Sequence, residues 1–157
     1  MKKGFTIVEL MVSIGILTIL FAFTTINITR LPSSAAQSAS YDRLISDIRS
    51  QQTKSMTGYD SSVTPVGGVS YGVHFETTSY TLFTGTNYSP SDSTNYVVEL
   101  DPNVTISATD FPSSQIVFTP GSGDVFGYLS GSDSVSLSNS TTGEVKTLQI
   151  NKYGATY

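Results

Sequence analysis

The chain has 157 residues, a formal net charge of −4 and no cysteine, so no disulfide and no cysteine-ligated metal site can form. Between Lys54 and Lys146 it carries no Lys or Arg but nine Asp or Glu, a balance that repels phosphate backbones and argues against nucleic-acid binding. Ser, Thr, Gly, Asn and Tyr dominate the chain after its N-terminal part, which is typical of a β-rich, surface-exposed domain.

An apolar stretch begins close to the N-terminus. Residues 5–28 are almost wholly apolar, and Glu9 is their only ionisable side chain. At ~1.5 Å rise per residue this stretch makes a helix of roughly 36 Å, which is enough to cross the ~30 Å hydrocarbon layer of a bilayer. We therefore predict a transmembrane and assembly helix over residues 5–30.

Basic residues flank this stretch unequally. Lys2 and Lys3 precede it, and only Arg30 follows it closely. By the positive-inside rule, the N-terminus is predicted to lie in the cytoplasm and the rest of the chain outside.

Glu9 is the unusual residue of the stretch. A carboxylate inside an apolar span costs ~2.5–3.5 kcal/mol on insertion scales, and such residues usually have a partner. One interpretation places Glu9 near the helix start, where it reaches the headgroups and the positive end of the helix dipole. The other interpretation is that Glu9 pairs with a positive charge that is created later. Cleavage between Gly4 and Phe5 would create an α-amine on Phe5, on the same helix face as Glu9.

The N-terminal pattern resembles the leader and cleavage site of type IV pilins and type II secretion pseudopilins; it reads Lys2-Lys3-Gly4 followed by Phe5-Thr6-Ile7-Val8-Glu9-Leu10. The resemblance implies that a prepilin peptidase removes leader residues 1–4 by cutting after Gly4 and methylates the new amine on Phe5. It also implies that Glu9 pairs with the N-terminal amine of a neighbouring subunit during filament assembly. Many members carry a proline near the end of the apolar helix, whereas the first proline here is Pro32.

An ordinary secretory signal peptide is the alternative for this segment. Lys2 and Lys3 would form its basic region, and Ser34-Ala35-Ala36 its cleavage site. The apolar region of a signal peptide runs over ~7–15 residues, and the stretch here is longer and contains an acid. The pattern therefore favours the pilin-type interpretation.

An amphipathic helix is predicted over residues 31–58. Pro32 disfavours α geometry at Leu31, so we expect a kink or short break there. The helix is expected to end near Thr57, with Gly58 as its C-terminal stop. Its apolar face is predicted from i, i+3, i+4 spacing to carry Tyr41, Leu44, Ile45, Ile48, Gln52 and Met56.

A β-rich globular domain is predicted over residues 59–157. After a loop at 59–68, alternation over 69–75 indicates a strand that forms a hairpin with 79–84. A loop at 85–94 follows, and Ser140 to Gly143 reads as the turn of a last hairpin. Further strands are expected at 96–100, 104–107, 115–119, 125–129, 135–138 and 145–150. The predicted class is α+β, a type IV pilin-like fold with a long N-terminal helix packed on an antiparallel sheet or sandwich.

The β-rich part also resembles the H-type minor pseudopilins. The stretches that carry this likeness are residues 44–56, 72–75, 116–121 and 148–154. In that group a glycine follows the last strand, and here it is Gly154.

No catalytic residue, metal or cofactor is predicted, and the protein is not expected to be an enzyme. His74 is the only histidine and lies on the polar side of its strand, which indicates a solvated side chain. Residues 92–95 and 101–103 offer oxygen ligands of the kind calcium prefers, but turn formation is the favoured role. The Gly-rich segment 121–127 has the wrong spacing for a dinucleotide loop and is predicted to be a hairpin turn.

Taken together, the predicted function is a minor pilin or pseudopilin. Its expected partners are other pilin subunits through their N-terminal helices, the prepilin peptidase and an inner-membrane assembly platform. The expected location is the cytoplasmic membrane, spanned once with the β domain outside, and then a pilus or pseudopilus. The alternatives are a major pilin, an adhesin or DNA-uptake subunit, and a secreted protein that starts near Gln37.

Overall fold

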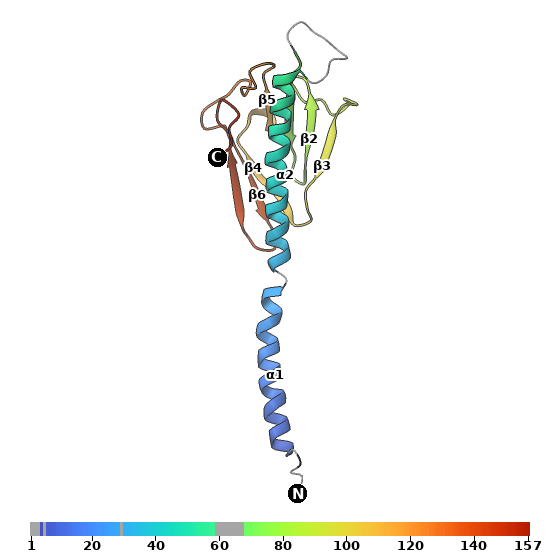
Figure 1. Cartoon of the computed structure of the whole chain (residues 1–157), viewed down its shortest axis with the longest axis vertical. Helices are drawn as coiled ribbons and strands as arrows, with labels where there is room; N and C mark the ends of the chain where they lie inside the picture. Colours follow the sequence, from blue (N-terminus) through green and yellow to red (C-terminus); the bar gives the residue numbers. More distant parts are fainter. Residues whose placement is uncertain (1–3, 5, 29, 59–67) are drawn as a thin grey trace.

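The computed structural model describes residues 4, 6–28, 30–58 and 68–157, and it leaves the side chains of residues 23–28 and 30–32 undescribed. Two helices, α1 (Ile7–Ile28) and α2 (Arg30–Thr57), precede every strand of the described chain. They follow one another along the long axis, and the strands gather around α2 while α1 extends away from them (Figure 1). The α+β class predicted from the sequence is confirmed. The predicted loop at 59–68 lies outside the described residues except for Gly68.

The helix is not broken at the proline. We predicted a kink or short break at Leu31 and Pro32, but α2 runs through both residues from Arg30 to Thr57, so the predicted break is wrong. Pro32 instead lies in the first turn of α2. A proline is tolerated there, because the N–H groups of a first helical turn have no acceptor within the helix.

The C-terminal end of α2 is where the sequence predicted it. The helix ends at Thr57, and Gly58 follows with φ +62°. The Gly58 N–H donates to the Lys54 carbonyl at 3.0 Å. A glycine in the left-handed conformation is the commonest way to close a helix, since it has no Cβ to clash.

The strands form two antiparallel sheets. The four-stranded sheet has the order β3-β2-β1-β5; its strands are β1 (Tyr71–Phe75), β2 (Ser79–Thr84), β3 (Tyr96–Glu99) and β5 (Gln115–Phe118). The three-stranded sheet has the order β4-β6-β7; its strands are β4 (Val104–Thr109), β6 (Ser134–Asn139) and β7 (Val145–Gln149). A 3-10 helix, η1 (Pro112–Ser114), leads into β5. The two predicted hairpins, β1–β2 and β6–β7, are confirmed.

One predicted strand is absent from the described chain. Residues 125–129 make only an isolated bridge between Val125 and Phe118. The Thr119 N–H donates to the Asp124 carbonyl at 2.8 Å, so the chain has just turned back along β5. Gly127 then takes φ +66° and directs the chain away from the strand. The apolar alternation in this segment therefore reflects a loop that packs on the sheet edge.

The core lies between α2 and both sheets. Leu44 and Ile48 of α2 are fully buried. The same cluster includes Val73, Phe75, Tyr80, Ile116 and Phe118 of the larger sheet and Ile106, Val135 and Leu137 of the smaller one. Because α2 contacts strands of both sheets, it joins them into one domain.

The buried face of α2 is more polar than the spacing predicted. Met56, expected on the apolar face, is half exposed, whereas Gln37, Ser40, Gln51 and Ser55 are buried. Their side chains bond groups of the sheets and loops. The Gln37 amide donates to the Leu137 carbonyl at 3.1 Å and to the Glu144 carbonyl at 3.0 Å. The Gln51 amide donates to the Gly72 carbonyl at 3.2 Å, and the Ser55 hydroxyl donates to the Phe118 carbonyl at 2.7 Å. The Ser40 hydroxyl donates to the Asp101 carboxylate at 2.7 Å. Such bonds satisfy carbonyls that the helix would otherwise cover and leave unpaired.

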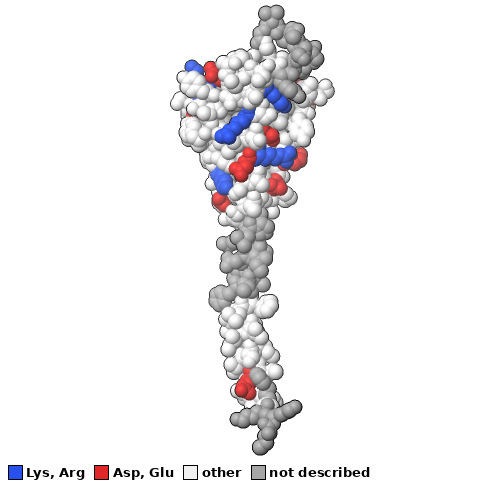
Figure 2. Space-filling view, viewed as in Figure 1, with Lys and Arg blue, Asp and Glu red and all other residues white. Residues whose placement is uncertain are grey.

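Charge is distributed unevenly along the molecule. On the side that carries α2, basic and acidic side chains are intermixed over the β domain (Figure 2). The described part of α1 is uncharged except for one acidic group near the end away from that domain (Figure 2). The two ends of the molecule therefore have surfaces suited to different surroundings.

Candidate assembly site

The N-terminus of α1 is closed by a reciprocal pair of side chains, Thr6 and Glu9. The Glu9 Oε2 atom accepts the Thr6 backbone N–H at 3.0 Å and the Thr6 hydroxyl at 2.9 Å. In return, the Glu9 backbone N–H donates to Thr6 Oγ1 at 3.2 Å. Thr6 also accepts the first helical bond, from the Leu10 N–H at 3.1 Å. This is a capping box, which satisfies N–H groups that a bare helix end would leave free.

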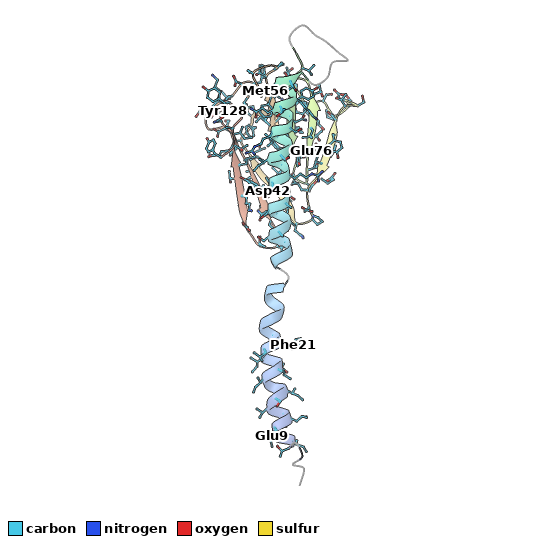
Figure 3. All side chains as sticks on the ribbon, in the orientation of Figure 1. Glu9, Phe21, Asp42, Met56, Glu76 and Tyr128 are labelled. Atoms are coloured by element: carbon cyan, nitrogen blue, oxygen red, sulfur yellow. The ribbon has the colours of Figure 1, made fainter. Side chains whose placement is uncertain are left out.

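The capping box uses only half of the Glu9 carboxylate. Among the described residues, the bonds to this group all reach Oε2, and the side chain lies on an exposed helix end. Figure 3 shows Glu9 at the end of α1 that points away from the β domain. Oε1 therefore has no hydrogen-bond partner among the described residues.

The described surface of α1 is apolar on all sides. Its side chains from Ile7 to Ala22 are exposed, with Ile7 at 81% and Phe21 at 72%. The hydroxyls of Ser13 and Thr18 donate to the helix's own carbonyls, at 2.7 and 2.8 Å. They therefore need no outside partner.

A helix that is apolar all round is stable only when something covers it. Full burial of one Leu- or Ile-sized side chain is worth about 1.5–3 kcal/mol. Burying two of them thus offsets the ~2.5–3.5 kcal/mol that a carboxylate costs in an apolar span. The single acid does not prevent α1 from entering an apolar environment.

Within the part of the chain that the structure describes, no helix reaches the length and apolarity needed to cross a membrane.

The predicted processing residues are only partly described. Lys2, Lys3 and Phe5 lie outside the described residues. Gly4 is exposed, and a Cβ atom placed on it would meet nothing within 4 Å. No described residue therefore packs against Gly4.

Thr6 is the residue of this site that the sequence analysis did not single out. Thr6 and Glu9 form the pattern Thr-x-x-Glu directly before an apolar run, which is the sequence signature of a capping box. That signature was present in the sequence and predicts the observed pair.

His74 is not the freely solvated side chain that we predicted. It is half buried, and its ring stacks on that of Tyr88 with centroids 4.0 Å apart and planes 11° apart. Burial lowers the pKa of His74, although the charge of Glu76 and the Ser113 backbone act in the opposite direction. Its Nδ1 atom is buried and has no hydrogen-bond partner in the described structure. His74 thus helps to hold the loop of Tyr88 on the sheet.

The acidic loops serve as turns. Asp92 Oδ1 accepts the Thr94 N–H at 2.9 Å and the Thr94 hydroxyl at 2.8 Å, which lowers the pKa of Asp92. The Asp101 carbonyl accepts the Val104 N–H at 3.0 Å. Over the described residues, no three His, Cys, Asp or Glu side chains lie together as metal ligands would.

Comparison with known proteins gives a family match for one segment of the chain. Residues 1–25 match the family model described as the prokaryotic N-terminal methylation motif. This motif indicates a type IV pilin-like protein that is processed as a prepilin, and it implies a membrane-anchored precursor. No curated protein and no solved structure matches the chain.

Proposed function

We propose that the protein is a structural subunit of a type IV pilus or a type II secretion pseudopilus, assembled through α1. The main observation behind this proposal is an exposed helix that is apolar except for one acid at its start. The methylation motif over the same residues supports it. A structural subunit needs no catalytic group, and the proposed role is mechanical.

The proposed mechanism has two steps. The peptidase cuts between Gly4 and Phe5 and methylates the Phe5 amine, while the apolar helix holds the subunit in the membrane. An assembly platform then moves the subunit into a bundle of like helices, where neighbouring helices replace lipid around α1. In the bundle, the open Oε1 of Glu9 pairs with the amine of a neighbour, and this charge pair offsets the loss of water and headgroups.

Within this class we propose a minor pilin or an H-type pseudopilin. Gly154 follows the last strand, β7, as in that group. The chain lacks the cysteines that many adhesive pilins use near their C-terminus. A major pilin is the alternative within the class.

Secretion after ordinary signal cleavage is a weaker alternative. A cut after Ala36 would divide α2 next to Gln37. The removed segment includes Ser33, whose carbonyl accepts the side-chain amide of Asn139 in the β domain at 2.7 Å. The cut would therefore remove a turn of helix that the domain uses.

A DNA-uptake role is also disfavoured. Residues 68–144 contain no Lys or Arg. The basic side chains over the β domain are intermixed with acidic ones in Figure 2, which does not favour binding to phosphates. An adhesin role would require a ligand surface on this domain, and binding assays with the full chain at low salt would test it.

Mass spectrometry of the mature N-terminus tests the proposed function. A chain that begins with methylated Phe5 supports a pilin-type subunit, and a chain that begins near Gln37 contradicts it. Gly4→Val is expected to leave the leader attached. Gly15→Val is a matched control, because Gly15 also lies in open space and its replacement should leave cleavage unchanged.

A further inference from the structure

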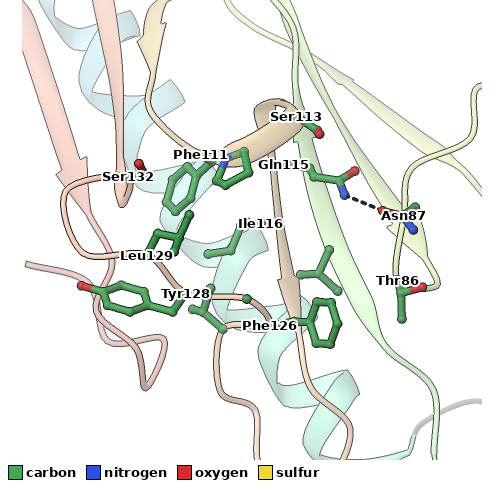
Figure 4. A pocket seen from close by; sticks show the side chains of 14 residues that line it. Thr86, Asn87, Phe111, Ser113, Gln115, Ile116, Phe126, Tyr128, Leu129 and Ser132 are labelled. Atoms are coloured by element: carbon green, nitrogen blue, oxygen red, sulfur yellow. Dashed lines mark hydrogen bonds between the residues drawn. The ribbon is translucent and has the colours of Figure 1, made fainter.

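A cavity lies beside β5, the strand at one edge of the four-stranded sheet. Its volume is about 210 Å³. Its walls come from β5, from the loop after β2, from the segment before β5 and from the loop that follows β5 (Figure 4). Loops that meet beside a rigid sheet are a common place for binding sites.

The walls of the cavity are apolar and partly aromatic. Phe111 and Ile116 are buried and belong to the core of the β domain. Phe126 and Leu129, which also line the cavity, are 59% and 56% exposed. The fold therefore leaves ring and methyl surface open at the cavity, on which another apolar surface can pack.

Uncharged polar groups accompany this apolar surface. Three hydroxyls at the cavity have no hydrogen-bond partner among the described residues, those of Thr86, Ser113 and Ser132. Asn87 Oδ1 accepts Gln115 Nε2 at 3.3 Å, and Gln115 Oε1 accepts the Tyr88 N–H at 3.0 Å. These bonds fix the Asn87 amide and leave its N–H groups to donate. None of the residues that line the cavity carries a charge.

The backbone is strained where it passes the cavity. Ser113 has φ +56° and ψ +25°, and Ser114 has φ +52°. A left-handed conformation is uncommon for a residue with a side chain, and such strain clusters at ligand-binding sites. Glycine at position 113 would relieve the strain, but it would also remove a hydroxyl from the cavity.

We propose that the cavity binds the ring of a neutral sugar. A cavity of roughly 150 Å³ holds a benzene molecule, so the space here accepts a six-membered ring with substituents. A sugar ring has faces of C–H groups and a rim of hydroxyls, which match the apolar walls and the unpaired polar groups. A purely apolar ligand would cover these polar groups without bonding them. An ionised ligand would find no opposite charge among the lining residues.

This inference goes beyond the proposed function, since sugar binding needs neither a processed N-terminus nor a filament. It would give the β domain the ligand surface that an adhesin role requires.

Ligand titrations followed by NMR test the proposal, on the full chain in a detergent without a sugar headgroup. The probes are glucose, galactose and N-acetylglucosamine, and the control ligands are cyclohexanol and glucuronate. Cyclohexanol has a six-membered ring with a single hydroxyl, and glucuronate adds a negative charge to the sugar. At least one neutral sugar should shift the signals of Ile116, Phe126 and Leu129, and it should bind at least fivefold more tightly than either control ligand.

Variants show whether the binding takes place in the cavity. Phe126→Ala should weaken sugar binding at least fivefold. Tyr153→Ala should not weaken it, because Tyr153 is similarly exposed, at 69%, but does not line the cavity. Ser113→Gly removes the strain together with the hydroxyl, so it should weaken sugar binding and leave the melting temperature unchanged or higher.

Several outcomes would overturn the proposal. They are the absence of shifts with all three sugars, binding of cyclohexanol as tight as that of the sugars, and equal effects of Phe126→Ala and Tyr153→Ala. Shifts of the same signals when the chain alone is concentrated would assign the cavity to a second copy and would also overturn it. None of these outcomes bears on the N-terminus, which mass spectrometry tests separately.

Discussion

The side-chain amide of Gln52 occupies the space that a Cβ atom on Gly154 would need. Gln52 Nε2 donates to the Gly123 carbonyl at 3.0 Å and to the Tyr153 carbonyl at 2.8 Å. Gly154 takes φ +76°, and an added Cβ would overlap the Gln52 amide and lie 3.1 Å from the Phe118 ring. One glutamine thus binds two loops to the last turns of α2.

Gly154→Ala should therefore destabilise the β domain by about 2–3 kcal/mol, from a strained backbone and displaced hydrogen bonds. Denaturant unfolding of the full chain in detergent measures the loss. Gly131→Ala is the control, because Gly131 has a similar φ of +84° but open space around it. That variant should lose only about 1 kcal/mol. Equal losses would show that the Gln52 contact contributes nothing.

The helices and strands were largely predictable, because the periodic patterns that indicate them depend only on residues close together in the sequence. The strand over Ser79–Thr84 and the end of α2 at Thr57 agree with the sequence prediction. The buried Gln37 and Gln51 were not predictable, because each bonds carbonyls supplied by strands and loops far along the chain. A polar residue on a helix gives no local sign that a distant backbone will need a donor.

Tyr80 and Asp47 form a partly buried polar contact between α2 and β2. The Tyr80 hydroxyl donates to Asp47 Oδ2 at 2.6 Å, and its ring is fully buried. Tyr80→Phe keeps the ring and removes the bond, at an expected cost of about 1–2 kcal/mol in the free energy of unfolding. Tyr153→Phe, on an exposed ring, should change nothing. An equal loss of free energy of unfolding in both variants would show that the loss does not come from the hydrogen bond between Tyr80 and Asp47.

The same pair predicts a pH dependence. Burial, and then the bond to Asp47, raise the pKa of Tyr80 far above its ordinary value. The fold therefore holds Tyr80 protonated, and above about pH 10 the unfolded chain loses that proton first. The contribution of the protonated Tyr80 to the free energy of unfolding is fully present below that pH and is lost as the pH rises further. Between pH 9 and 11, the free energy of unfolding measured with denaturant should fall more steeply for the native chain than for Tyr80→Phe.

His74 predicts the opposite dependence on the acidic side. Its pKa is lowered, chiefly by burial, so the folded state favours the neutral ring and the unfolded chain binds a proton first. Stability should fall as pH drops below about 6.5, the ordinary pKa of histidine. His74→Phe keeps a flat ring against Tyr88 but cannot titrate. If both chains lose stability equally between pH 7 and 5, His74 is not the group responsible.

The candidate assembly site could be identified from the sequence only in part, and its role in assembly stays a prediction. Glu9 was identifiable because it is the only ionisable residue in an apolar run. Thr6 was not identified as its partner, although the Thr-x-x-Glu spacing places the two side chains on one helix turn. The loop at 125–129 was mistaken for a strand, because Val125 and Phe126 alternate in burial without pairing along a ladder.

A single alanine variant cannot separate the capping role of Glu9 from its proposed charge pair with a neighbouring subunit. Glu9→Ala removes the cap of Thr6 and the charge together. Glu9→Gln removes the charge but keeps an oxygen that can accept the Thr6 N–H and hydroxyl. Loss of a capping side chain costs about 1 kcal/mol, which is small beside the burial that holds α1 in an apolar environment.

If assembly needs a charge pair with the amine of a neighbour, both variants should be exported and cleaved normally but enter filaments at least tenfold less. If the cap is what matters, Glu9→Gln should assemble like the native chain, and Thr6→Ala should fail as Glu9→Ala does. Quantitative immunoblots of purified filaments against total membranes separate these outcomes. Normal incorporation of Glu9→Gln would reject charge pairing, because that variant differs from the native chain only in the charge that the pair requires.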